Sequence, residues 1–171
     1  MGDTYWPLCQ QTISACLFLP AFMCPAGSQS EASKSVVRSY AKKMFNDHAP
    51  DNAAELLAPG AKWHGGNLGT VEGAQNIAGL FKGVIAALPD LKNTEQDMIA
   101  EGEMVVVRSI VEATHKGNLL GFPATNRRVR WDAIDWYRVV GGKIVEEWAS
   151  EDALKILADI GAYTPPWMKQ A

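Results

Sequence analysis

The feature that most constrains the fold is a pair of strand-like segments on either side of Gly141-Gly142. In the first segment, residues 127–140, polar and apolar side chains alternate, and a period of two is typical of a strand with one buried face. One face of this segment carries Trp131, Ala133, Asp135, Tyr137 and Val139. The second segment covers residues 143–149. Two such segments joined by a short glycine turn predict an antiparallel hairpin.

Hydrophobic periods predict the other elements of the chain. Helices are predicted at residues 36–45, 50–57, 77–88 and 152–160. Strands are predicted at residues 62–64, 91–100, 105–115, 127–140 and 143–149. Helices followed by an antiparallel meander and a final helix indicate an α+β fold, in which the helices cover one face of a curved sheet.

The length of 171 residues suits one domain. We expect this domain to cover residues 34–163, between an N-terminal segment of residues 1–33 and a C-terminal tail of residues 164–171. The apolar stretch 13–23 is too short to span a membrane, which takes about 20 residues. The expected architecture is therefore a single α+β domain with no membrane span.

The N-terminal segment has two interpretations. The length of its apolar stretch fits the core of a signal peptide, but the segment has Asp3 and neither Lys nor Arg before Lys34, whereas signal peptides begin with positive charge. It is either an extension that stays on the chain, which places the protein in the cytoplasm, or a signal peptide cleaved near residue 26. In the second case the protein is secreted or periplasmic.

Charge and cysteine content exclude several classes of protein. Sixteen basic and nineteen acidic residues give a net charge of −3, which argues against a nucleic-acid partner. The three cysteines all lie within residues 1–24, so disulfides are not expected to hold the domain together. The three histidines are far apart in the sequence, and no metal site is expected.

Three stretches of the body resemble one known family. They are residues 73–91, which end in Leu-Pro-Asp-Leu; residues 114–117 with 121–128; and residues 134–138 with 142–148. In this order they are similar to the SnoaL-like polyketide cyclases, also called ester cyclases. The resemblance covers most of residues 36–161.

The resemblance implies a fold, a pocket and a chemistry. The fold is the cone-shaped α+β barrel of the nuclear-transport-factor-two-like superfamily, which is usually a homodimer with a deep apolar pocket between sheet and helices. The best-known members close rings on polyketide esters by intramolecular aldol condensation, with neither metal nor organic cofactor. A carboxylate and a histidine in the pocket move the protons.

The match to the catalytic residues of that family is incomplete. The aspartate that acts as acid and base in the aldol cyclases aligns with Ala149, and their pocket histidine falls on Asp135. The superfamily also contains isomerases, dehydratases and non-catalytic members, so the fold does not fix the function. We expect acid/base chemistry, in the form of cyclisation, isomerisation or dehydration, on an apolar carbonyl compound of polyketide or terpenoid type.

Asp135 is the candidate that the sequence itself singles out. It is the one charged residue in the apolar row of residues 131–139, and a carboxylate in such a position is costly unless it is paired, hydrogen-bonded or protonated. It is therefore either a pocket acid/base with a raised pKa or a structural aspartate that an Arg, a Tyr or backbone amides satisfy.

The partner of Asp135 depends on the turn of the hairpin. A three-residue loop, Val140-Gly141-Gly142, pairs Val139 with Lys143 and sets Glu147 opposite Asp135 on the same face. A two-residue turn, Gly141-Gly142, pairs Val140 with Lys143 and sends Glu147 to the other face. We favour the longer loop, which makes Asp135 and Glu147 a pair of catalytic carboxyls.

Further site residues complete the prediction. His115, at the end of an apolar row, and His64, at the expected mouth of the pocket, are candidate catalytic residues, although a lone histidine in such a position more often has a structural, hydrogen-bonded role. The side chains expected to bind the substrate are aromatic: Trp63, Phe81, Phe122, Trp131 and Tyr137.

Two functions remain open from the sequence. In the first, the chain is an enzyme of the kind described above. In the second, it is a non-catalytic binding or interaction domain of the same fold, in which an arginine such as Arg108 neutralises Asp135 or Glu147. Under the favoured register, Ile134, Trp136 and Trp148 form an apolar patch on the outer face of the sheet, which indicates a homodimer interface.

Overall fold

The computed structural model describes residues 26–168 of the chain. Most of the predicted N-terminal segment of residues 1–33, including its possible cleavage near residue 26, therefore lies outside the described residues. Within the described range, no helix combines the length and the apolar character that a bilayer crossing needs. In the tail predicted for residues 164–171, Pro165 is fully buried, so its first residues pack against the domain.

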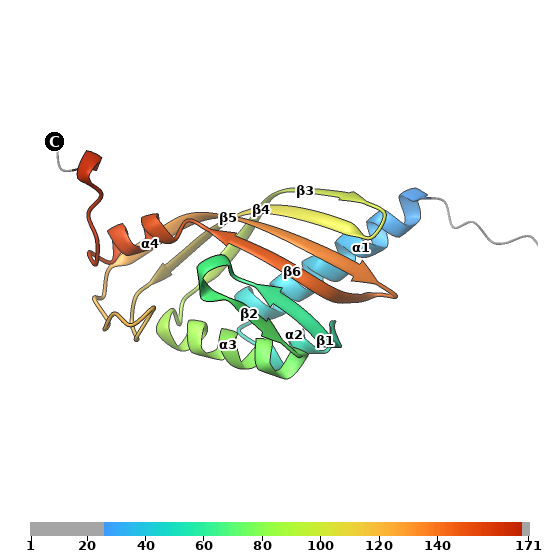
Figure 1. Ribbon diagram of the computed structural model, residues 1–171, viewed down its shortest axis with the longest axis horizontal. Coiled ribbons are helices and arrows are strands. Elements are labelled where there is room, and N and C mark those ends of the chain that lie inside the picture. The colour runs from blue at the N-terminus through green and yellow to red at the C-terminus, as the bar shows by residue number, and fades with distance from the viewer. Residues whose placement is uncertain (1–25, 169–171) are drawn as a thin grey trace, which may run out of the picture.

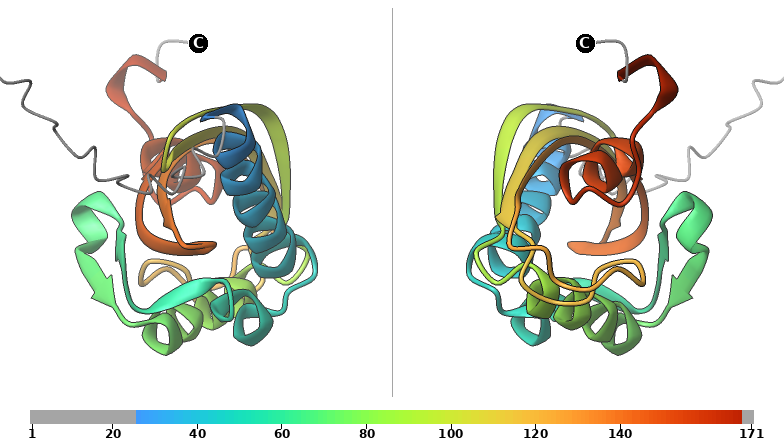
Figure 2. Two further views of the ribbon diagram at one scale, coloured as in Figure 1. Left: turned by 90° about the vertical axis from the view of Figure 1, so that its right-hand side faces the viewer. Right: turned by 90° about the vertical axis from the view of Figure 1, so that its left-hand side faces the viewer.

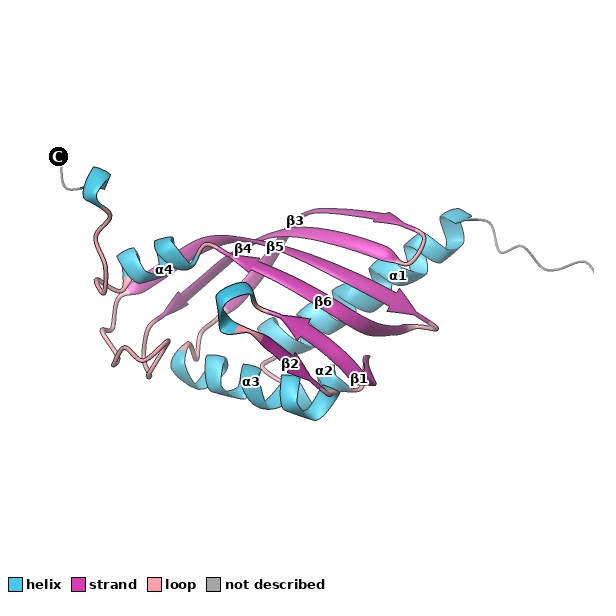
Figure 3. Ribbon diagram, viewed as in Figure 1, coloured by secondary structure: helices cyan, strands magenta, loops and turns pink. Residues whose placement is uncertain are grey.

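The described residues form one six-stranded sheet in the order β2-β1-β6-β5-β4-β3 (Figures 1 and 3). The strands are β1 (Leu57–His64), β2 (Thr70–Glu72), β3 (Lys92–Glu101), β4 (Met104–Thr114), β5 (Arg128–Val140) and β6 (Lys143–Glu151). Neighbouring strands are antiparallel, except that β1 and β6 run parallel. This arrangement confirms the predicted α+β fold and meander, and adds a parallel pair that joins the first strand to the last.

Four α-helices accompany the sheet in the described part of the chain: α1 (Ala26–Ala41), α2 (Pro50–Ala54), α3 (Ala74–Ala87) and α4 (Ala153–Asp159). In Figure 2 the strands curl around an interior that α1 and α3 close from the open side. The short helix α4 lies at one end of the curled sheet (Figure 1). The helices therefore cover the concave face of the sheet and leave its convex face uncovered.

Two helix boundaries differ from the prediction. The first helix begins ten residues before the predicted start at residue 36. Residues 26–35 are small or polar and carry no apolar stripe, so hydrophobic periodicity could not identify them as helical. The predicted helix through Leu57 ends at Ala54, and Leu57 starts β1 instead. Pro59-Gly60 lies within β1, whose pairing with β6 is interrupted between Leu57 and Lys62.

Buried and more exposed side chains alternate along the whole of β5, as predicted. On the inner face, Trp131, Ala133, Asp135, Tyr137 and Val139 are all buried. On the other face, Ile134 and Trp136 are about half exposed, at 51% and 49%. Period two therefore sorts this strand into a core face and a solvent face, as the sequence predicts.

The β5–β6 turn corrects the favoured register. Val140 pairs with Lys143, so Gly141-Gly142 forms the two-residue turn, and both glycines have the positive φ angles, 56° and 77°, that such a turn requires. Val139 then pairs with Ile144 and Arg138 with Glu146, which leaves Val145 as an extra residue. This bulge reverses the facing of every later side chain in β6.

The bulge therefore decides where Glu147 points. With a two-residue turn alone, Glu147 would lie on the outer face. The extra residue returns it to the inner face, where it lies opposite Tyr137, and Asp135 lies opposite Ala149. Asp135 and Glu147 share the inner face, as the favoured loop predicted, but as diagonal neighbours rather than as a directly opposed pair.

The interior has two apolar clusters rather than one. The first includes Tyr40, Phe81 and Tyr137, and the second includes Leu88 and Ile156. Residues of both clusters face the same hollow between the sheet and α3. The division of the core therefore leaves room for a cavity.

Candidate active site

A cavity of about 400 Å³ lies between the concave face of the sheet and the helices. Its walls are mainly apolar, and both core clusters contribute to them. Three aromatic rings form one continuous wall: Phe45 and Trp63 each pack edge-on against Phe81, with centroid distances of 5.2 and 5.9 Å. Cavities of this size and character are typical of small-molecule sites.

The mouth of the cavity is lined by exposed segments from three parts of the chain. These are residues 66–68 after β1, Leu120 in the loop before β5, and residues 150–153 at the end of β6. Gly65 lies tightly against the Trp63 ring, which a Cβ atom at this position would overlap. Only glycine therefore allows the chain to turn so closely past this wall.

Asp135 carries the carboxyl that lines the cavity interior. It is 4% exposed and accepts no hydrogen bond from any described residue. Burial raises the pKa of Asp135 well above its usual range, and the negative charges of Glu151 and Glu147 raise it further. Asp135 is thus a carboxyl that holds its proton firmly and, once ionised, takes one back readily.

Glu147 lies on the same face but outside the cavity lining. It is 2% exposed, and its Oε2 accepts a hydrogen bond of 3.1 Å from the Tyr40 hydroxyl. Burial raises the pKa of Glu147 to about 8, although the hydrogen bond from Tyr40 acts in the opposite direction. Glu147 is therefore a second carboxyl close to its titration point near neutral pH.

Glu151, at the end of β6, is the site carboxyl that the sequence analysis missed. The residue is exposed at the mouth, while its carboxyl is turned against the buried ring of Trp131 and accepts a hydrogen bond from the indole Nε1–H. Burial of this carboxyl raises the pKa of Glu151. Three carboxyls of raised pKa therefore share one face of β5 and β6.

The arginine expected for a non-catalytic domain does not reach these carboxyls. Arg108 lies on the exposed face and pairs with Asp97, with 2.6 Å between Nη2 and Oδ2. None of the described ion pairs involves Asp135, Glu147 or Glu151.

The two predicted catalytic histidines lie outside the cavity lining. His64 is on the outer side of the sheet, where its ring stacks on Trp148 and its Nε2 lies 3.0 Å from Glu146. His115 is fully buried, and its Nδ1 is hydrogen-bonded to Thr125 Oγ1 at 3.0 Å. The structure therefore brings Asp135 to the cavity and leaves both histidines in hydrogen-bonded positions away from it.

The predicted substrate-binding residues divide in a similar way. Trp63, Phe81 and Trp131 line the cavity. Tyr137 is buried beside the carboxyls, opposite Glu147, and Phe122 is 37% exposed in the loop that carries Leu120. Phe45 and Leu120 are lining residues that the sequence analysis did not name.

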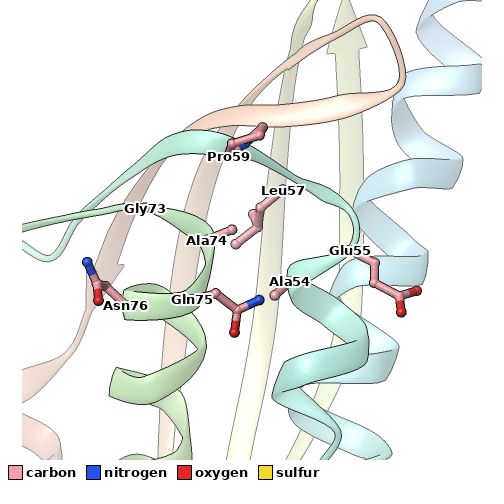
Figure 4. Close-up of a pocket in the computed structure, with 8 residues that line it drawn as sticks. All are labelled: Ala54, Glu55, Leu57, Pro59, Gly73, Ala74, Gln75 and Asn76. Carbon is pink, nitrogen blue, oxygen red and sulfur yellow. The ribbon is translucent and has the colours of Figure 1, made fainter.

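A second hollow, of about 370 Å³, lies at the surface between α2, the start of β1 and the start of α3. Its one charged residue, Glu55, is exposed and points away from Gln75 and Asn76 (Figure 4). Among the described residues, no cluster of His, Cys, Asp or Glu has an arrangement that would hold a metal ion. The inner cavity with Asp135 is therefore the candidate active site.

Known proteins resemble this chain over nearly the whole described range. Residues 34–160 match a family profile described as SnoaL-like polyketide cyclase. The aklanonic acid methyl ester cyclase DnrD of Streptomyces peucetius is 28% identical over 140 residues, which make up 82% of this chain and 93% of that protein. A second aklanonic acid methyl ester cyclase, DauD of Streptomyces sp. strain C5, is 29% identical over 140 residues, or 81% and 83% of the two chains.

Solved structures resemble the fold as well. A protein from Jannaschia sp. CCS1, described as a SnoaL-like polyketide cyclase, superposes with a TM-score of 0.73 at 19% identity, over 80% of this chain and 96% of that one. A protein with a ketosteroid isomerase-like fold from Catenulispora acidiphila superposes with a TM-score of 0.65 at 18% identity, over 76% and 97%. These likenesses show the fold and agree with the predicted cone-shaped architecture.

Proposed function

This chain belongs to the SnoaL-like polyketide cyclase family, and from this premise we propose that it closes a ring in an apolar carbonyl compound of polyketide type by acid/base chemistry at Asp135. The observation that carries the proposal is a buried carboxyl with no hydrogen-bond partner among the described residues, in the wall of an apolar cavity. Two relatives are aklanonic acid methyl ester cyclases, which supports a polyketide ester as the class of substrate.

One carboxyl is enough for ring closure because the reaction consumes no net proton. In the proposed reaction, the Asp135 carboxylate takes a proton from a carbon next to a carbonyl group. The resulting enolate carbon forms a bond to a second carbonyl carbon of the same molecule, and the electrons of that carbonyl move to its oxygen. Asp135 then returns its proton to this oxygen. A raised pKa suits both steps, because it makes the carboxylate a stronger base and keeps the acid within reach of neutral pH.

By the resemblance to the aldol cyclases, Asp135 would take the place of the family's pocket histidine, and Ala149, which lies opposite it, would stand where those enzymes have their aspartate. In this chain the proton-transferring group is therefore proposed to lie on β5 rather than on β6. The aromatic wall of Phe45, Trp63 and Phe81 would hold the apolar body of the substrate. Glu147, outside the lining, would act on Asp135 through its charge.

We further propose a homodimer formed through the convex face of the sheet. Four apolar side chains of this face are in register across four strands: Ile99 lies next to Val106, Val106 next to Trp136, and Trp136 next to Trp148. Ion pairs border this stripe on either side, Arg108 with Asp97 and Arg138 with Glu146. An apolar centre with a polar rim is the usual composition of an interface between subunits.

Incubation with aklanonic acid methyl ester and other polyketide methyl esters tests the proposed function. Ring closure by aldol addition leaves the mass unchanged, so the product is a compound of the same mass and a different chromatographic retention. We expect Asp135→Asn to lower kcat by at least about 100-fold. The control is Asp132→Asn, which changes an exposed aspartate of the same strand on the opposite face.

Conversion by the wild-type protein and the Asp132→Asn variant, but not by Asp135→Asn, supports the proposal. Undiminished conversion by Asp135→Asn would overturn the role of this carboxyl. Binding of the esters without any conversion would favour a binding protein of the same fold.

A further inference from the structure

The three site carboxyls form a file along the inner face of β5 and β6. Pairing places Tyr137 opposite Glu147, Asp135 opposite Ala149 and Ala133 opposite Glu151. Because side chains on one face recur every second residue, Asp135 lies diagonally between Glu147 and Glu151. Glu147 is buried and Glu151 is at the exposed end, so the file runs from the protein interior to the cavity mouth.

Among the three carboxyl residues, Glu151 is the one that is both exposed to solvent and part of the cavity lining. Its residue is exposed and lines the mouth, while its carboxyl is held by the indole N–H of Trp131, which is itself part of the cavity wall. The hydrogen bond fixes the carboxyl over the cavity rather than leaving it free in water.

The surroundings of Asp135 contain acids and no base of opposite charge. On β5 and β6 the facing titratable groups are Glu147, Glu151 and the Tyr137 hydroxyl, and α1 adds the Tyr40 hydroxyl. The segments contributed by α3 and α4 are apolar, and none of the described lining residues is Lys, Arg or His. Beyond the effect of burial, the charges that act on the ionisation of Asp135 are therefore those of the two neighbouring carboxyls, Glu151 and Glu147.

We infer that Glu151 is a positioning residue for the reaction, which controls from the cavity mouth whether Asp135 is ionised and exchanges the proton of Asp135 with the solvent. This inference rests on the proposed function of Asp135 as acid and base. When Glu151 carries a negative charge, Asp135 keeps its proton; when Glu151 is neutral, Asp135 ionises more readily. The proton of Asp135 returns to water through the exposed member of the pair, Glu151.

The variant Glu151→Gln distinguishes the effect of the negative charge of Glu151 from the effect of its hydrogen bond to Trp131. Glutamine keeps an oxygen that accepts the hydrogen bond from Trp131, so the mouth retains its shape while the negative charge is lost. The matched control is Glu101→Gln, the same change at an exposed position at the far end of β3. Carbon-13 NMR of labelled aspartate carboxyls, with the Asp135 signal assigned from the Asp135→Asn variant, follows the titration directly.

We expect the Asp135 signal of Glu151→Gln to titrate at lower pH than that of the wild type, and the signal of Glu101→Gln to stay at the wild-type position. In turnover, the ratio of kcat/KM at pH 5 to kcat/KM at pH 8 should rise about three- to tenfold in Glu151→Gln, since removal of a nearby like charge favours the ionised form. An unchanged Asp135 titration in Glu151→Gln would overturn the inference. Because the NMR titration needs no substrate, its result stands apart from the cyclase assay, whose failure would overturn only the proposed function.

Discussion

Tyr40 and Glu147 meet in the interior although they are 107 positions apart in the chain, with the Tyr40 hydroxyl donating to Glu147 Oε2 at 3.1 Å. Both side chains are almost fully buried. The bond joins α1 to the last strand of the sheet. The bond replaces part of the hydration energy that the buried carboxylate loses. The part that is not replaced disfavours the charged form and therefore raises the pKa of Glu147.

Burial of Glu147 makes the stability of the folded protein depend on pH. The pKa of Glu147 is raised from 4.5 to about 8 by burial. Between these values the folded protein binds a proton that the unfolded chain has lost, so the contribution of Glu147 is fully present below about pH 4.5 and is lost as the pH rises toward 8. We expect Glu147→Gln, which still accepts from Tyr40, to remove this loss and to be more stable than the wild type at pH 8 by on the order of 2 kcal/mol.

Urea denaturation at pH 5 and pH 8 measures this difference. Glu55→Gln, at an exposed position on the surface, is the control and should follow the wild type at both pH values. A Glu147→Gln variant whose stability falls between pH 5 and pH 8 as steeply as that of the wild type would show that Glu147 is not the group responsible.

The second prediction concerns the space beside Asp135. Ala149 lies directly opposite Asp135 and lines the cavity, so Ala149→Leu adds three carbon atoms where the substrate would lie. We expect kcat/KM for bulky esters to fall by about tenfold or more, because overfilling a packed site excludes ligand or costs about 1–3 kcal/mol. The Asp135 titration should persist, since the carboxyl itself is untouched.

Steady-state kinetics with esters of increasing size tests this prediction, together with the melting temperature as a check on folding. The control Ala86→Leu makes the same change on the exposed side of α3 and should leave kcat/KM unchanged. Equal kcat/KM values for Ala149→Leu and the wild type across all ester sizes would place the substrate elsewhere.

The third prediction concerns the convex face. Trp136 and Trp148 are paired there with 49% and 38% of their surfaces exposed. If this stripe joins two copies of the chain, Trp136→Glu should convert the dimer to a monomer, because it buries an unpaired charge in an apolar interface. Leu154→Lys, at an exposed apolar position on α4, is the control and should leave the molar mass unchanged.

Size-exclusion chromatography with light scattering gives the molar mass of each variant. A wild-type protein that is monomeric at micromolar concentration, or a Trp136→Glu variant that stays dimeric, would exclude this face as the interface.

Sequence alone predicted the burial of Asp135 because strand alternation is a local property. The apolar side chains of residues 131–139 are buried only if this face of the strand points to the core, and Asp135 lies on the same face, so it is buried with them. The lack of an arginine partner was left open by the sequence, since Arg108 pairs with Asp97 across β3 and β4, a contact that depends on the register of two other strands.

The facing of Glu147 was predicted through an incorrect turn. The sequence favoured a three-residue loop, which takes Val140 out of the first strand, whereas the structure has a two-residue turn and an extra residue, Val145, in β6. A shift of one residue on either side of the hairpin turns Glu147 to the inner face. The sequence Ile144-Val145-Glu146 has no residue that predicts a bulge in the strand rather than an extra residue in the turn. Glu151 did have a signal: it continues the period of Glu147 and Ala149, and was missed because the strand was predicted to end at Ala149.

The positions of the histidines depend on long-range pairing. His64 lies on the outer side of the sheet because β1 pairs in parallel with β6, and its neighbour Trp63 then faces the cavity. A short extended segment beside a turn gives no indication of which distant strand it will join. Of the aromatic residues expected to bind the substrate, Trp63, Phe81 and Trp131 therefore line the cavity, whereas neither histidine does.

The single extra residue at Val145 also bears on how such a chain can diverge. Loss of Val145 would remove the bulge and leave Glu146 opposite Arg138 and Glu147 opposite Tyr137, so the side chains beyond it would keep their faces. The acidic lining therefore does not depend on the exact number of residues between the turn and Glu147, provided that an added residue is accommodated as a bulge. Descendants of this fold could gain or lose this residue and keep the same chemistry.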